Sequence, residues 1–88
     1  MPPQEKPHVA LGQAIRELRL QADLTQEALA HRADVTVGQL SKIERGHSNP
    51  RWLTVMKIAY GLGVSLSDLV AREEALMQRS KSAEAGSR

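Results

Sequence analysis

The sequence contains no cysteine, which excludes a disulfide framework, a cysteine-containing zinc site and a thiol nucleophile. It also contains no phenylalanine, and aromatic residues make up only 2% of the chain. A core must therefore be built from Leu, Val, Ile, Ala and Met, with Trp52 and Tyr60 as its only large rings. This composition favours a helical bundle. The apolar runs are too short to span a membrane and no signal-peptide pattern is present, so we expect a cytoplasmic protein.

Strong net charge is missing as well, because the formal charge of the 88 residues is only +2. Basic side chains are nevertheless concentrated in one stretch, where Lys42, Arg45, His47 and Arg51 accompany a single acid, Glu44. The sequence shows no paired catalytic carboxylates, no Gly-rich phosphate loop and no cluster at metal-ligand spacing. We therefore expect neither an enzyme nor a bound cofactor or metal.

Apolar residues recur at helical spacing along most of the chain, and no segment shows the alternation of a strand. The spacing predicts a helix over residues 8–22, another from Pro50 to about Leu62, and one that follows a capping box of Ser65 and Asp68. The inward face of the helix after Pro50 is predicted to hold Trp52, Val55, Met56, Ala59 and Leu62.

The two ends of the chain depart from this pattern. Three prolines in residues 1–7 disfavour a helix and predict a flexible arm. Residues 80–88 have no apolar periodicity and are predicted to form a disordered tail. Residues 8–79 then make up one small all-α domain.

Residues 25–46 predict two short helices joined by a tight turn. Thr25 is placed to cap the first helix, and Thr36 the second, with Gln39 completing a capping box. Asp34 lies in the turn, and Gly46 is suited to end the second helix. This spacing is typical of a helix-turn-helix, whose second helix enters the major groove of DNA.

Five linked stretches extend this likeness over residues 11–70, which is about two-thirds of the chain. They are LGQAIRELR from Leu11, LTQEALA from Leu24, LSKIERG from Leu40, Asn49-Pro50, and IAYGLGVS from Ile58. In order and spacing they resemble the phage-repressor/Cro-type (XRE-family) helix-turn-helix domain. The resemblance implies a five-helix, lambda-repressor-like fold that usually binds palindromic DNA as a dimer.

The candidate base-reading residues lie near the start of the second helix of the motif. The outward positions there are Thr36, Val37, Gly38, Ser41 and Lys42. Lys42 is able to donate to guanine, whereas Val37 offers only an apolar contact and Gly38 has no side chain. Two interpretations of Gly38 stay open, a helix weakened for no functional reason and a close approach of the backbone to DNA. We expect modest direct readout and more reliance on DNA shape.

Contacts with the DNA backbone are expected from residues at the two ends of the motif. Gln26 begins the first helix, where its side chain and the free N–H groups are able to hold a phosphate, as the matching glutamine commonly does in the family. Gln39 either completes the Thr36 cap or reaches the DNA backbone. The residues placed where the family grips the flanking backbone are Arg45, His47, Asn49 and Arg51. Arg51 alternatively reaches the minor groove between half-sites.

Two further features follow from the resemblance. Residues matching Arg19 and Glu44 form a salt bridge in several family members, and the same pair is predicted here, where it would fix the recognition helix. Asp34 departs from the glycine that the family usually has in the turn. Asp tolerates a left-handed backbone better than most residues, so the turn should survive with some strain.

The leading interpretation is a sequence-specific transcriptional regulator that binds double-stranded, palindromic operator DNA as a homodimer. The predicted dimer interface consists of Leu66, Val70, Leu76 and Met77. The alternative is an antitoxin-like protein-interaction module on the same fold, with weak or no DNA binding. Its partner surface would consist of Leu53 together with the same four residues, Leu66, Val70, Leu76 and Met77. Phage repressors, restriction–modification controllers and antitoxins all remain open, as does a further protein partner. No membrane partner is expected.

Overall fold

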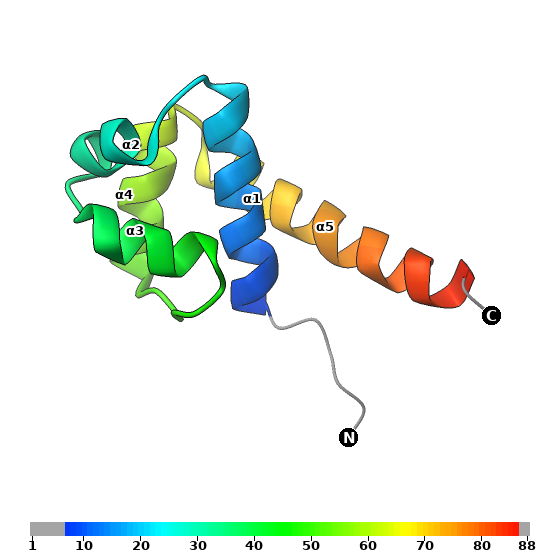
Figure 1. Ribbon diagram of the computed structural model, residues 1–88. Coiled ribbons are helices and arrows are strands. Elements are labelled where there is room, and N and C mark those ends of the chain that lie inside the picture. Colours follow the sequence, from blue (N-terminus) through cyan, green and yellow to red (C-terminus); the bar gives the residue numbers. More distant parts are fainter. Residues whose placement is uncertain (1–6, 87–88) are drawn as a thin grey trace.

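Five α-helices make up the part of the chain that the computed structural model describes, residues 7–86 (Figure 1). In order they are α1 (Pro7–Gln21), α2 (Gln26–Ala33), α3 (Val37–Glu44), α4 (Trp52–Leu62) and α5 (Leu66–Gly86). No strand occurs between residues 7 and 86, and the predicted all-α class is confirmed. Proline suits the first position of a helix, so Pro7 opens α1. The rest of the predicted arm lies outside the described residues.

Three helices begin at the predicted caps. The hydroxyl of Thr25 accepts from the Ala28 N–H at 3.0 Å, and Thr36 caps α3 in the same way. At α5, Ser65 and Asp68 form the full reciprocal box, with bonds of 3.0 and 3.3 Å. The prediction that Pro50 begins α4 was wrong. Pro50 lies just outside that helix, because Arg51 is the N-cap residue and contributes no side-chain cap.

The first four helices all end on a residue with a left-handed backbone: Asp23, Asp34, Gly46 and Gly63. After each of these ends, two backbone N–H groups turn back to the last carbonyls of the helix, as in a Schellman motif. Asp34 adopts φ 56 and ψ 48, so the turn survives with an aspartate in the strained conformation. The same conformation at Asp23 was not predicted.

The core is aliphatic, and every helix contributes to it. The largest side chains that are fully buried are Ile15, Leu29, Leu40, Ile43, Ile58 and Leu69. The prediction for the two aromatic rings was wrong, because Trp52 is 62% and Tyr60 82% exposed. Met56, predicted to face inward, is 46% exposed. The apolar residues of α4 cover two adjacent sides of the helix, and only the side with Ile58 packs on the core.

Helix α5 is longer than predicted. It packs beside α1, and its C-terminal half extends away from the other helices (Figure 1). Arg72 on α5 forms an ion pair with Glu17 of α1 at 3.0 Å. The helix runs to Gly86, so the prediction of a disordered tail was wrong for residues 80–86. Four of the seven residues from 80 to 86 are good helix formers, Lys81, Ala83, Glu84 and Ala85, and they favour a helix without any apolar stripe.

Within the described residues, no single helix is long and apolar enough to cross a bilayer. Among residues 7–86, one pair of consecutive segments, Trp52–Leu62 and Leu66–Arg79, reaches that length and composition together, and the pair is bent by 101°.

Candidate nucleic-acid interface

The inner side of the helix-turn-helix packs on the core, and its outer side is exposed. On the inner side of α3, Leu40 and Ile43 are almost completely buried. Val35 in the turn is half-buried, and Ala30 on α2 is 2% exposed. The outer side of α3 carries every predicted base-reading residue. Ser41 is half-buried, and the exposed ones are Thr36, Val37, Gly38 and Lys42.

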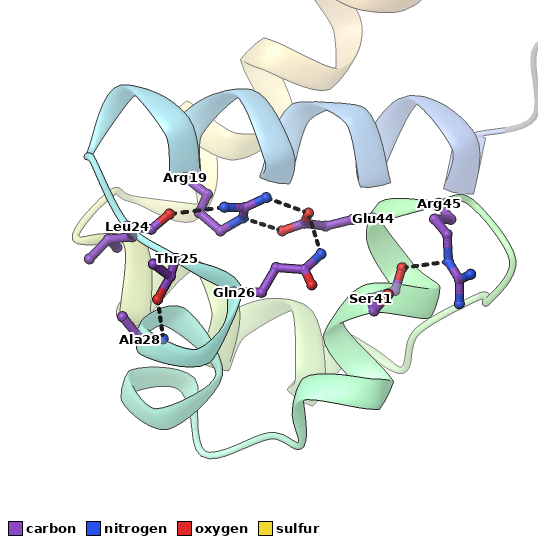
Figure 2. Close-up of polar contacts among 8 residues, drawn as sticks. All are labelled: Arg19, Leu24, Thr25, Gln26, Ala28, Ser41, Glu44 and Arg45. Atoms are coloured by element: carbon purple, nitrogen blue, oxygen red, sulfur yellow. Dashed lines mark hydrogen bonds and ion pairs between the residues drawn. The ribbon is translucent and has the colours of Figure 1, made fainter.

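A buried ion pair joins the end of α3 to α1, as predicted. Arg19 donates to both carboxylate oxygens of Glu44, from Nε at 2.7 Å and from Nη2 at 3.0 Å (Figure 2). A third donor of Arg19, Nη1, reaches the carbonyl of Leu24 at 2.9 Å. The hydrogen bond to Glu44 raises the pKa of the Arg19 guanidinium, although burial acts against it. Charge-assisted bidentate pairs of this kind have a defined geometry, so the pair fixes the orientation of α3 relative to α1.

Gln26 joins the same network, which the sequence did not reveal. Its Nε2 donates to Oε1 of Glu44 at 3.0 Å, so one carboxylate connects α1, the start of α2 and the end of α3 (Figure 2). No buried side-chain polar atom among the described residues is left without a hydrogen-bond partner. The contact depends on how α2 lies over α3, and no local pattern around Gln26 indicates it.

The loop after α3 carries four exposed polar side chains: Arg45, His47, Asn49 and Arg51. Arg45 donates weakly to the carbonyl of Ser41, at 3.3 Å, and therefore lies back along α3 (Figure 2). The Gln39 side chain makes no hydrogen bond within residues 7–86, so the second half of the predicted capping box is not formed. The side chain is exposed and available to an external partner.

The four predicted dimer residues on α5 do not all lie at its surface. Leu76 is only 7% exposed and belongs to the core, so its assignment to an interface was wrong. Leu66 and Met77 are half-buried against the core, and Val70 is half-buried. Four of the six large exposed apolar residues between residues 7 and 79 lie instead on α4: Trp52, Leu53, Met56 and Tyr60. Their helical spacing places them on one side of α4, which we call the α4 apolar face.

Comparison with known proteins agrees with this geometry. Residues 15–69 match the protein family described as helix-turn-helix, which covers both helices of the motif and the core around it. The chain belongs to the XRE-type helix-turn-helix family. Thr25, Thr36, Leu40 and Ile43 all fall inside the matched region.

Named relatives include regulators of two kinds. The immunity repressor protein of Bacillus phage phi105 is 35% identical over 65 residues, 74% of this chain and 45% of the repressor. The control protein C.MunI of a Mycoplasma species is 36% identical over 62 residues, 69% of this chain and 84% of that protein. The chain thus spans about half of the phage repressor but most of the control protein.

A solved structure resembles almost the whole chain. The clp gene regulator ClgR from Corynebacterium glutamicum superposes with a TM-score of 0.91 at 28% identity. The match covers 98% of this chain and 92% of that one. Such coverage takes in most of the long α5 as well as the helix-turn-helix.

Proposed function

We propose that this member of the family is a sequence-specific transcriptional regulator. It binds a palindromic operator as a homodimer, in the cytoplasm and associated with the nucleoid. The observation that carries the proposal is the open outer side of α3, because the core and the Glu44 network hold the helix from its other sides. A rigid helix with one free side is what the major groove admits. The names of the relatives, a repressor and a control protein, support regulation.

Each exposed residue then has a role that fits its chemistry. Lys42 donates to guanine and Val37 contacts a thymine methyl group, with Thr36 and Ser41 as hydroxyl donors beside them. Gln26 is held by Glu44 at the N-terminus of α2, where the free N–H groups suit a phosphate. Further phosphate contacts come from Gln39, Arg45, His47, Asn49 and Arg51.

The second subunit is proposed to cover the α4 apolar face, in place of the α5 surface that the sequence predicts. Trp52 and Leu53 are both 62% exposed, and such large side chains are rarely left in water as a group. They follow directly after Arg51, at the end of the loop that contacts DNA. A two-fold axis beside Trp52 places the two Arg51 side chains near the operator centre, with the recognition helices on either side.

The test is selection of bound duplexes from a random library, followed by titration of the best site at several salt concentrations. We expect a palindromic site and a steep fall in affinity with salt, because Lys and Arg release counterions from phosphates. Lys42→Ala should weaken binding to that site, whereas Gln78→Ala, an exposed change on α5, should leave it unaltered. No enriched sequence, or an affinity independent of salt, would refute the proposal.

One observation favours the alternative, a protein-interaction module on this fold. Val37 and Gly38 supply no hydrogen-bonding side chain at the tip of α3, while the α4 apolar face is exposed. If the double variant Gln26→Ala, Lys42→Ala keeps its regulatory effect in cells and no DNA is enriched, this second function is correct.

A further inference from the structure

Gly38 is a glycine that the fold itself does not require. Two others, Gly46 and Gly63, both have a φ of 73°, which a side chain rarely adopts. Gly38 lies instead within the regular helix α3. A Cβ atom added there would meet no heavy atom within 4 Å. Neither the backbone conformation nor the packing of the domain therefore selects glycine at this position.

The contrast with the two remaining glycines between residues 12 and 63 is direct. A Cβ on Gly12 would collide with the carbonyl oxygen of Ile43, where α1 crosses α3. A Cβ on Gly61 would lie 3.0 Å from Leu29 Cδ1 and 3.1 Å from the nitrogen of Ala33, where α4 meets α2. Gly12 and Gly61 permit two helices to cross closely, whereas no other helix of the domain approaches Gly38.

Glycine is also a poor choice for α3 on local grounds. Gly38 is the second residue of an eight-residue helix, where any ordinary side chain would reduce the entropy lost on folding. The position is exposed, so an alanine there would be accommodated and would favour the helix. The fold gains nothing from the missing side chain, so any advantage that it gives lies in what α3 contacts from outside.

The surroundings of Gly38 indicate the chemistry of that contact. On the surface of a helix its neighbours are the residues three and four positions on, Ser41 and Lys42, beside the preceding Val37. Val37 is 38% exposed and wholly apolar. The missing side chain thus leaves a gap bordered by an apolar group. Among the base edges in the major groove, only thymine presents an apolar group, its 5-methyl.

We propose that Gly38 is a specificity-determining residue. Its missing side chain admits a thymine methyl group, which packs against Val37 and the bare backbone of α3. This inference rests on the proposed function, because it requires α3 to lie in the major groove. It adds to that function a reason for choosing a T·A pair at one defined place in each half-site.

The first test is Gly38→Ala, measured by thermal unfolding and by titration with the selected operator. We expect the melting temperature to rise by about 2–8 °C, since alanine favours the helix. We expect the affinity to fall about 25- to 10,000-fold, as for one mismatched base pair in each half-site, since the new methyl occupies the place of the thymine methyl in both subunits. Gln78→Ala is the control for a helix-surface substitution and should leave the affinity unchanged.

The second test replaces each thymine of the operator by deoxyuridine, which lacks only the methyl group. One replacement in a single half-site should weaken wild-type binding about fourfold, the effect of exposing one methyl, and should have no effect on Gly38→Ala. A stabilised Gly38→Ala that binds as tightly as wild type would overturn the inference, as would indifference to every deoxyuridine or a lowered melting temperature. If the wild-type protein selects no duplex at all, both the proposed function and this inference fail. A selected site with no response at Gly38 refutes this inference alone.

Discussion

Replacing Glu44 by glutamine tests the buried network at its centre. The carboxylate accepts three hydrogen bonds, two from Arg19 and one from Gln26, at 2.7 to 3.0 Å. In Glu44→Gln one oxygen becomes an NH₂ group that faces a donor, and Arg19, 8% exposed, keeps a buried charge without its counterion. Removing one partner of such a pair costs about 3–5 kcal/mol.

This cost is large against the stability of a domain of this size, which is typically about 5–13 kcal/mol. Because 1 kcal/mol shifts the melting temperature of a small domain by about 4–8 °C, we expect a decrease of at least about 12 °C. Thermal and urea unfolding followed by far-UV circular dichroism measure the change. The matched control is Glu27→Gln, on the exposed surface of α2, which should stay within about 0.5 kcal/mol of wild type.

The double variant Arg19→Met, Glu44→Leu distinguishes the loss of the ion pair from the cost of a buried charge without a partner. Replacing both charges by apolar groups of similar size is often neutral, so the double variant should be more stable than Glu44→Gln alone. If the free-energy losses of Arg19→Met and Glu44→Leu simply add, the two residues do not act as a pair. A Glu44→Gln variant as stable as Glu27→Gln would refute the reasoning entirely.

Three further predictions concern the turn, the dimer and pH. Asp34→Gly should raise the free energy of unfolding, measured in urea, by about 0.5–1 kcal/mol. The reason is that removing the strain of a left-handed aspartate outweighs the extra conformational entropy that glycine gives the unfolded chain. A loss of stability would show that the Asp34 side chain itself stabilises the turn. Leu53→Asp should weaken dimerisation about tenfold or more in sedimentation equilibrium, without lowering the stability of the monomer. If Val70→Asp weakens the dimer and Leu53→Asp does not, the interface lies on α5. Desolvation, followed by repulsion from Glu74, raises the pKa of Glu73, so that its folded form prefers the neutral acid. The penalty is absent below the unfolded pKa of 4.5 and complete above the folded pKa, so Glu73→Gln should raise the melting temperature slightly at pH 7 and not at pH 4; an equal effect at both values would contradict this.

Features that depend on a few neighbouring residues were predictable from the sequence. The caps at Thr25 and Thr36 are local hydrogen bonds, and the reciprocal box of Ser65 and Asp68 is another. The inward positions of Leu40 and Ile43 follow from their spacing of three residues, which places both on one side of α3. The Arg19–Glu44 pair joins residues far apart in the chain, and it was predicted only through the family resemblance.

Other features required knowledge of which surfaces meet. Helix α4 has apolar residues on two adjacent sides, and periodicity alone could not decide that Ile58 faces the core while Trp52 faces outward. Gln26 reaches Glu44 only because α2 and α3 cross as they do. Gly38 shows the same division most clearly. Its position on the outer side of α3 could be read from the sequence, but only the empty space around it shows that the fold has no need of glycine there. A sequence encodes local preference directly, whereas the space around a residue is set by chain segments far from it.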